Sequence, residues 1–279
     1  MNLVTTEWLE KNLDSVKIFD ASWHMPSSKR GAKKEYKEKH IKGAMFWDVD
    51  EHSDKDSPFP HMMSNSDYWA RMLWSFGIQN EDHIIVYDYS DTYSSCRLWF
   101  ALKYFGHKKV SVLDGGMKKW LKENRSTSNK INDDLGKFSS IDKLNPKSRY
   151  KVSESTGWIK SKKDIDENIK TLSFQTVDAR SRERFEGKVD EPRPGLKKGC
   201  IVGSKNIPFK ECINPETNTF KTKDELNVIF DKNGVDVSKP IVFTCGSGMT
   251  ACVLGMAYSI ISGKNAVVYD GSWSEYGKK

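Results

Sequence analysis

Short apolar runs alternate with amphipathic segments along the 279 residues of the chain. The runs at 84–87 and 241–244 have the length of buried strands. Segment 66–74 instead carries apolar side chains at the spacing of a helix face, and Gly77 follows it as a stop signal. Strands that alternate with helices favour parallel sheets that are covered on both faces. The pattern therefore predicts an α/β protein.

The order of these elements occurs twice along the chain. The paired segments are 17–22 with 175–180, 40–46 with 200–209, 84–88 with 241–245 and 110–116 with 266–272. We therefore predict two tandem domains, residues 1–125 and 149–279, each a mostly parallel sheet with helices on both faces. The polar stretch 126–148 lacks sustained periodicity and is predicted to link them.

Charge and hydropathy exclude several functional classes. The formal net charge is +7, but lysines and acids are interleaved, as in 33–39, which is typical of a solvated face. A nucleic-acid binder would concentrate basic and aromatic side chains in one patch, so we expect no nucleic-acid partner. A mildly positive field suits a small anionic substrate. No apolar run approaches the roughly 18–20 residues of a membrane span, so we expect no membrane association.

The first residues and the cysteines bear on the cellular compartment. Residues 1–8 lead directly into a helical pattern, without the apolar core of a signal peptide or an arginine-rich leader. We expect a cytosolic protein, with mitochondrial import without a clear leader as the alternative. The five cysteines are odd in number and lack the paired spacing of a zinc site or a disulfide framework. They are expected to be reduced, and neither a metal nor an organic cofactor is implied.

Cys245 is the candidate nucleophile. It stands where the apolar run 241–244 ends and an apolar helical pattern, 251–257, begins. Two neighbouring glycines let the backbone fold tightly, so the sulfur is expected to face free N–H groups and the positive end of the helix. Both effects favour a thiolate. The alternative is a buried cysteine in a tight turn.

The repeat provides an internal comparison for Cys245. The first half carries Asp88 at the matching position, followed by the loop 89–93, which contains no cysteine. We therefore expect one half to perform chemistry and the other half to frame the site.

On these residues the chain resembles the tandem sulfurtransferases of the rhodanese family, over nearly its whole length. Members of that family that take thiosulfate usually carry basic residues after the cysteine, whereas those that take 3-mercaptopyruvate carry a neutral Cys-Gly-Ser-Gly-x-Thr loop. This chain has the neutral form. The resemblance therefore implies 3-mercaptopyruvate as the sulfur donor, with a substrate-binding loop that includes Gly246, Gly248, Met249 and Thr250.

The same resemblance implies a pair of substrate arginines, Arg184 and Arg193. A 2-oxo acid offers a carboxylate and an adjacent carbonyl oxygen, and planar guanidinium groups bind such oxygen arrays better than an ammonium group does. The alternative is that both arginines belong to a charged surface loop, because acidic residues surround them.

Three further residues are implied as a proton-handling triad. Asp50 and His61 have the spacing of an Asp and a His that the family uses together with the serine of the loop, here Ser247. His52 and Asp54 lie nearby in the sequence and are the alternatives to this pair. We prefer Asp50 and His61 because of their position in the motif.

The resemblance also implies a reaction sequence. Cys245 would take the sulfur as a persulfide and release pyruvate, and a thiol such as thioredoxin or a small thiol, or cyanide, would accept it, with hydrogen sulfide released by a dithiol. The alternatives are a thiosulfate:cyanide sulfurtransferase and a sulfur carrier without turnover. A cysteine phosphatase is disfavoured, because Ala251 stands where that loop needs an arginine.

Overall fold

The computed structural model describes residues 1–131, 135–137 and 149–279 and contains two compact units. The first unit comprises Met1–Asp54 and Met63–Ser155, and the second comprises Lys55–Met62 and Thr156–Lys279. Most of the predicted linker, 126–148, lies outside the described residues.

The short segment 149–155 belongs by its contacts to the first unit. The amide of Ser153 donates to the carbonyl of Phe105 at 3.1 Å, and the amide of Ser155 donates to that of Tyr104 at 2.8 Å. The buried Tyr150 hydroxyl lies 2.9 Å from Nδ1 of His107. These contacts attach the end of the first unit to its own core.

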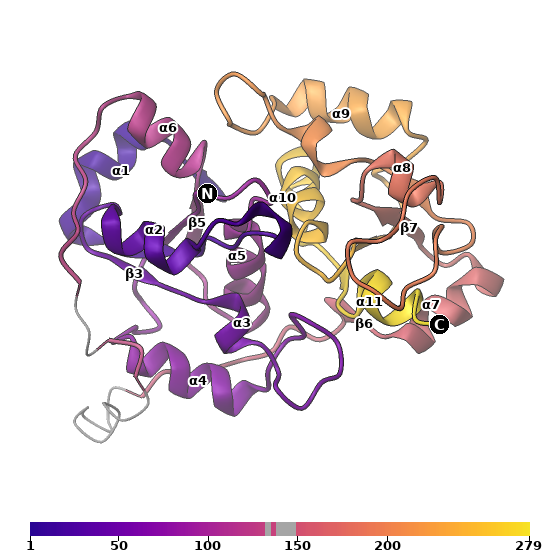
Figure 1. Cartoon of the computed structure of the whole chain (residues 1–279), viewed down its shortest axis with the longest axis horizontal. Helices are drawn as coiled ribbons and strands as arrows, with labels where there is room; N and C mark the ends of the chain where they lie inside the picture. Colours follow the sequence, from indigo (N-terminus) through magenta and orange to yellow (C-terminus); the bar gives the residue numbers. More distant parts are fainter. Residues whose placement is uncertain (132–134, 138–148) are drawn as a thin grey trace. The chain divides into compact units, whose positions relative to one another are not determined.

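The first unit contains one five-stranded parallel sheet in the order β1-β5-β4-β2-β3 (Figure 1). Its strands are β1 (Leu3–Val4), β2 (Lys17–Asp20), β3 (Ala44–Phe46), β4 (Ile84–Tyr87) and β5 (Val110–Leu113). Its helices are α1 (Thr6–Asn12), α2 (Ala32–Glu38), α3 (Val49–His52), α4 (Ser66–Ser75), α5 (Ser95–Tyr104) and α6 (Gly116–Lys122). The predicted helix at 66–74 is present as α4, which Asn65 caps by accepting a hydrogen bond from the amide of Tyr68.

The second unit repeats this topology with the order β6-β10-β9-β7-β8, again with every pair parallel (Figure 1). Its strands are β6 (Ile159–Lys160), β7 (Gln175–Asp178), β8 (Lys205–Asn206), β9 (Ile241–Thr244) and β10 (Val268–Tyr269). Its helices are α7 (Lys162–Thr171), α8 (Arg182–Phe185), α9 (Lys223–Lys232), α10 (Ala251–Ser262) and α11 (Ser272–Tyr276). The prediction of two repeated α/β domains is confirmed.

The central strands explain why the cysteine loop is well anchored. All four residues of β9 are buried, as are all four of β4, because helices cover both faces of a parallel sheet. Helix α10 follows the loop and is buried along nearly its whole length. Gly255 allows this close packing, since a Cβ there would lie 2.7 Å from the Cβ of Ala266. Gly263 ends the helix in the left-handed conformation, with φ 70°.

Candidate active site

Cys245 follows β9 directly and begins the turn that leads into α10. The start of α11 holds this turn from the side. The amide of Trp273 donates to the carbonyl of Cys245 at 3.0 Å, and the amide of Ser274 donates to that of Gly246 at 2.8 Å. The Ser274 hydroxyl also donates to the Gly246 carbonyl, at 2.6 Å. Two successive carbonyls are thereby fixed, and Cys245 is only 2% exposed.

The amide groups of the loop fall into two sets. The hydroxyl of Ser272 accepts hydrogen bonds from the amides of Cys245 and Gly248, each at 3.1 Å. These two amides are therefore bonded, whereas the sequence predicts free N–H groups around the sulfur. Four other amides find no acceptor among the described residues: those of Gly246, Ser247, Met249 and Thr250. Unpaired amides in a tight loop before a helix are suited to stabilise an anion, here a sulfur anion.

His61 and Ser247 meet in the second unit. Nδ1 of His61 lies 2.9 Å from the hydroxyl oxygen of Ser247, and both side chains are buried. The segment Lys55–Met62 that carries the histidine belongs to this unit, where the Lys278 ammonium lies 5.5 Å from the ring centroid of Phe59. His61 has a left-handed backbone, with φ 63°, a conformation that costs a residue other than glycine about 1–2 kcal/mol. Such strain is often found where a functional side chain is positioned.

Asp50 and the two alternative residues belong to the first unit. Oδ2 of Asp50, on α3, accepts a hydrogen bond from the indole N–H of Trp23 at 2.9 Å. Nδ1 of His52 lies 2.8 Å from the hydroxyl of Tyr68, and the side chain of His52 is buried. The role of Asp50 beside His61 stays a prediction.

Arg184 and Arg193 both lie beside the cysteine loop. Arg184 is on α8, and Arg193 follows it in the next loop. A Cβ placed on Gly246 would lie 3.2 Å from Nη2 of Arg184 and 3.9 Å from Nη1 of Arg193. The two guanidinium groups therefore reach the residue next to the candidate nucleophile, as the substrate role requires.

Sequence reasoning missed the acidic residue that holds one of these arginines. Glu191 is buried, and its Oε2 accepts a hydrogen bond from Nη2 of Arg184 at 2.5 Å. Its Oε1 accepts from Nε of Arg184 at 3.2 Å and from Nη1 of Arg180 at 2.8 Å. In the sequence Glu191 was only one of several acids around the arginines.

Arg180 completes a buried chain of charges behind the site. Its Nη2 donates to Oδ2 of Asp178 at 2.7 Å and to the carbonyl of Gly199 at 2.8 Å, and its guanidinium lies 4.4 Å from the ring centroid of Trp273. Burial disfavours its charged form, but Asp178 and Glu191 outweigh this effect and raise the pKa of Arg180. Arg180 is therefore a permanent cation that fixes Glu191, and Glu191 in turn fixes Arg184.

Two carboxylates belong to this chain of charges. Asp178 pairs with Arg180, and Glu191 pairs with both Arg180 and Arg184. They offset part of the positive charge that an anionic substrate would meet. Among the residues that the structure describes, no group of three His, Cys, Asp or Glu side chains is placed to hold a metal ion.

Three of the other four cysteines are fully enclosed, and Cys200 is partly exposed. Cys96, Cys212 and Cys252 are fully buried, and burial raises the pKa of Cys212 to about 12. The thiol of Cys252 donates to the carbonyl of Gly248 at 3.2 Å, so it supports the loop from the first turn of α10.

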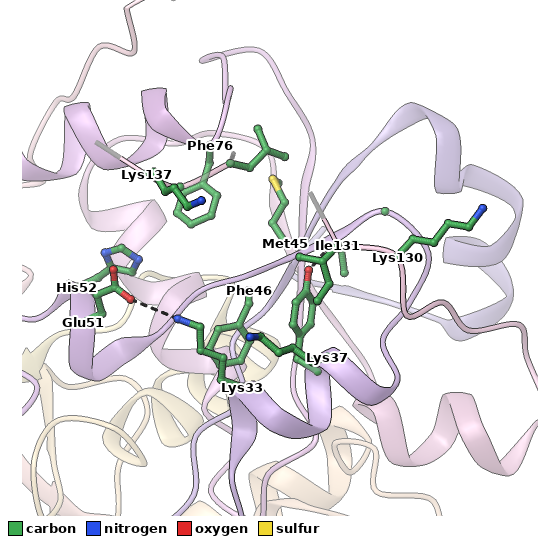
Figure 2. Close-up of a pocket in the computed structure, with 15 residues that line it drawn as sticks. Lys33, Lys37, Met45, Phe46, Glu51, His52, Phe76, Lys130, Ile131 and Lys137 are labelled. Carbon is green, nitrogen blue, oxygen red and sulfur yellow. Dashed lines mark hydrogen bonds and ion pairs between the residues drawn. The ribbon is translucent and has the colours of Figure 1, made fainter. Parts of the chain in front are cut away.

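A separate cavity of about 530 Å³ lies in the first unit, next to α2 and β3 (Figure 2). Its lining includes Lys33, Lys37, Phe46 and Phe76. Of the candidate residues it includes His52, one of the two alternatives to the Asp50–His61 pair, but not Cys245, Ser247, His61 or the arginines. We place the candidate active site at the Cys245 loop because the candidate nucleophile, the His61–Ser247 contact and the arginines are found there.

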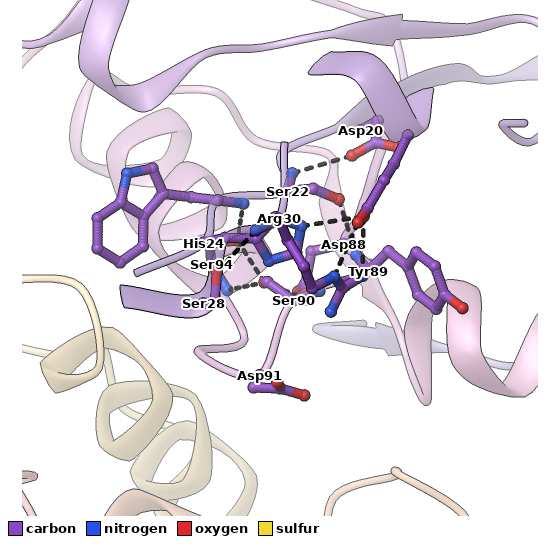
Figure 3. Close-up of polar contacts among 12 residues, drawn as sticks. Asp20, Ser22, His24, Ser28, Arg30, Asp88, Tyr89, Ser90, Asp91 and Ser94 are labelled. Atoms are coloured by element: carbon purple, nitrogen blue, oxygen red, sulfur yellow. Dashed lines mark hydrogen bonds and ion pairs between the residues drawn. The ribbon is translucent and has the colours of Figure 1, made fainter. Parts of the chain in front are cut away.

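The first unit has its own version of the loop, closed by an aspartate (Figure 3). Oδ1 of Asp88 accepts hydrogen bonds from the amide and the hydroxyl of Ser90, at 2.9 and 2.7 Å, and Oδ2 accepts from the amide of Ser95 at 3.0 Å. Arg30 donates to the carbonyl of Tyr89 at 2.9 Å. This loop contains no thiol.

Known proteins share this architecture. The sequence model of the rhodanese-like domain matches residues 5–123 and 161–279. A 3-mercaptopyruvate sulfurtransferase of Mus musculus is 41% identical over 98% of this chain and 91% of its own length. A thiosulfate sulfurtransferase of Rattus norvegicus is 35% identical over 98% of this chain and 91% of its own. SseA from Escherichia coli, a 3-mercaptopyruvate sulfotransferase of known crystal structure, superimposes with a TM-score of 0.83 and 32% identity, covering 98% of this chain and 99% of that chain.

Proposed function

The chain belongs to the family of proteins built from rhodanese-like domains, and from this premise we propose that it is a 3-mercaptopyruvate sulfurtransferase with Cys245 as its nucleophile. One observation carries the choice of donor: the residues after Cys245 are neutral, while Arg184 and Arg193 reach Gly246 from another part of the unit. The positive charge thus stands where a carboxylate would bind, one residue away from the thiol.

The donor binds through its 2-oxo acid group. Arg184, held by Glu191, and Arg193 hydrogen-bond the carboxylate and the carbonyl oxygen of 3-mercaptopyruvate, which places the donor sulfur toward Cys245. Because Glu191 offsets part of the positive charge of the arginines, the cluster suits a monoanionic donor.

The first half-reaction transfers one sulfur atom. The thiolate of Cys245 attacks the donor sulfur, a sulfur–sulfur bond forms, and the carbon–sulfur bond breaks with its electron pair left on the enolate of pyruvate. The enolate takes up a proton at carbon to become pyruvate. Ser247, hydrogen-bonded to His61, moves this proton from the thiol of the donor, and Asp50 assists in the predicted triad. The unpaired loop amides stabilise the persulfide anion.

The second half-reaction returns the enzyme to its starting state. The thiolate of a small thiol or of thioredoxin attacks the outer sulfur of the persulfide, and Cys245 leaves as a thiolate. A second thiol of the acceptor then displaces hydrogen sulfide and forms a disulfide. Cyanide accepts the same sulfur as thiocyanate. Such ping-pong chemistry proceeds through a covalent enzyme intermediate that remains after the first product has left.

The proposal is tested by mass measurement of the intact protein. After incubation with 3-mercaptopyruvate without an acceptor, the chain should gain the mass of one sulfur atom, and a reducing thiol should remove it. Cys245→Ser should neither gain this mass nor turn over. Turnover by Cys245→Ser would contradict the proposal.

Thiosulfate is the competing donor, because the rat thiosulfate sulfurtransferase is 35% identical to this chain. The neutral loop, and the arginine charge that Glu191 partly offsets, favour the monoanionic donor. We therefore expect kcat/KM to be higher for 3-mercaptopyruvate than for thiosulfate. A sulfur carrier without turnover would instead form the persulfide once and show no multiple turnovers with any pair of small donor and acceptor.

A further inference from the structure

We propose that Ser272 is a positioning residue of the cysteine loop, whose hydroxyl holds the loop where no side chain at the position of the nucleophile does so. This inference rests on the proposed role of Cys245. It begins from the hydrogen bonds of one fully buried side chain.

The hydroxyl of Ser272 connects three points of the backbone. It donates to the carbonyl of Tyr269 at 2.8 Å, at the end of β10. It accepts from the amide of Cys245 and from that of Gly248, each at 3.1 Å. The hydroxyl of Thr244 also lies 3.3 Å from it, so the Ser272 hydroxyl, with one proton to donate and two lone pairs, has no bonding capacity left. Ser272 therefore ties both ends of the turn at Cys245 to the neighbouring strand.

Ser272 occupies this place with an unfavourable backbone. Its φ is 49°, in the left-handed region that residues other than glycine seldom adopt. The repeat places Gly116 at the matching position of the first unit, also left-handed with φ 54°. A glycine would relieve the backbone here too. Ser272 is thus a residue other than glycine in a left-handed conformation, and the hydrogen bonds of its hydroxyl compensate for the cost of that backbone.

The backbone contact next to this position is the same in both units. The amide of Met117 donates to the carbonyl of Asp88 at 2.9 Å, as the amide of Trp273 donates to that of Cys245 at 3.0 Å. A Cβ on Gly116 would lie 2.5 Å from the Asp88 carbonyl oxygen, so the first unit has no room for a serine there. The two loops are therefore built on one frame and closed by different side chains.

The difference follows from what the nucleophile replaces. In the first unit the carboxylate of Asp88 binds the amides of its own loop, those of Ser90 and Ser95. In the second unit Cys245 stands at that position, and a thiolate that must attack a donor cannot also hold the loop. The hydroxyl of Ser272 binds two other amides of the turn, those of Cys245 and Gly248, and leaves the sulfur free.

This arrangement also selects the amides that remain for the substrate. Ser272 occupies the amides of Cys245 and Gly248, and the intervening amides of Gly246 and Ser247 stay unpaired among the residues that the structure describes. Loss of the hydroxyl would let the turn relax and spoil the alignment of these donors. Preorganised donors act on the developing charge, so kcat should fall while donor binding by the arginines is unchanged.

Two variants and a control separate the hydroxyl from the backbone. Ser272→Ala removes the hydroxyl and keeps the Cβ and its restraint, whereas Ser272→Gly removes the hydroxyl and relieves the left-handed residue. Ser259→Ala is the matched control, because Ser259 is a buried serine of α10 whose hydroxyl donates to the carbonyl of Lys264, away from the loop. Single-turnover persulfide formation and steady-state kinetics are measured on all three, with thermal melting to verify folding.

We expect kcat and the rate of persulfide formation to fall about tenfold or more in both Ser272 variants. The loss should not exceed the factor of about 10²–10³ that follows removal of one preorganised donor. KM for 3-mercaptopyruvate should change less than twofold, and Ser259→Ala should behave as the parent chain. Should Ser272→Ala melt too early to assay, Ser272→Gly, which relieves the backbone, decides alone.

Three outcomes would overturn the proposal. They are an unchanged kcat in Ser272→Ala or Ser272→Gly, a rise in KM with kcat intact, and a loss confined to Ser272→Gly, which would mean that backbone rigidity is what matters. An active Ser272→Ala beside an inactive Cys245→Ser would refute the role of Ser272 and leave the proposed function intact. Turnover by Cys245→Ser would refute the proposed function itself.

Discussion

Glu191 binds Arg184 through both oxygens of its carboxylate, with Oε2 at 2.5 Å from Nη2 and Oε1 at 3.2 Å from Nε. The carboxylate is itself fixed by the buried Arg180. A long side chain that would otherwise move freely is thereby ordered before the donor arrives. Preorganisation of this kind reduces the entropy lost when a substrate binds. It also lowers the net charge that the donor meets.

Glu191→Gln should weaken the discrimination between the two donors. The amide keeps the shape of the carboxylate but removes its charge and one of its acceptors, so Arg184 is held less firmly and the site gains positive charge. We expect the ratio of kcat/KM for 3-mercaptopyruvate to that for thiosulfate to fall about tenfold, equivalent to about 1.4 kcal/mol.

Glu186→Gln is the matched control for that measurement. Glu186 lies on the same segment but is half exposed and pairs with Lys188 rather than with Arg184. An equal change of the donor ratio in Glu186→Gln would mean that general surface charge, and not the contact with Arg184, sets the preference.

His61→Asn and Ser247→Ala should each lower kcat by roughly a hundredfold, within the range of about 10²–10⁴ for a positioned proton-transfer group. Asparagine is chosen because it tolerates the left-handed backbone of His61. KM should change little, since neither residue is expected to hold the carboxylate. The double variant should be no slower than the slower single one, because the two residues act as a unit. Additive losses would show that they act separately.

Gly246→Ala should raise KM for 3-mercaptopyruvate about tenfold, equivalent to about 1.4 kcal/mol, with a smaller effect on kcat, because the added methyl group would displace the carboxylate from the arginines. The added Cβ would stand 3.2 Å from Nη2 of Arg184 and 3.9 Å from Nη1 of Arg193, in the space that the carboxylate needs. The φ of Gly246 is not positive, so stability should change little. An unchanged KM would mean that the donor does not bind between these groups.

Local sequence signals located the main elements but not their mutual contacts. The positions of β4, β9 and α4 follow from apolar runs and capping signals, and the cysteine loop follows from a strand that ends before a helix. Ser272 acts on Cys245 from 27 residues away, and His61 reaches Ser247 across 186. Such contacts depend on strand order, which residue patterns do not specify.

The buried charges show a second limit of sequence reasoning. Acidic residues among arginines, such as Glu191, are typical of a solvated face. Only the fold shows that the side chain of Glu191 is 2% exposed and pairs with Arg180 and Arg184. Arg193 and Arg184 were found through the family resemblance, whereas their acidic partner had no motif of its own.

Asp20 should make the first unit less stable as the pH rises through the weakly acidic range. Its carboxyl is buried at the end of β2, accepting from the amide of Ser22 at 2.9 Å, and burial raises its pKa to about 6 (Figure 3). The folded protein therefore holds this proton more tightly than the unfolded chain, whose carboxyl titrates near 3.9. The stabilisation from the bound proton is complete below about pH 4 and is lost by pH 6 to 7. Asp20→Asn keeps an acceptor for Ser22 without the charge, so at pH 7 it should be more stable than the parent by about 2–3 kcal/mol. Urea unfolding at pH 4 and pH 7 measures this difference, which should nearly vanish at pH 4; an advantage of equal size at both values would show that packing, and not the buried charge, is its cause.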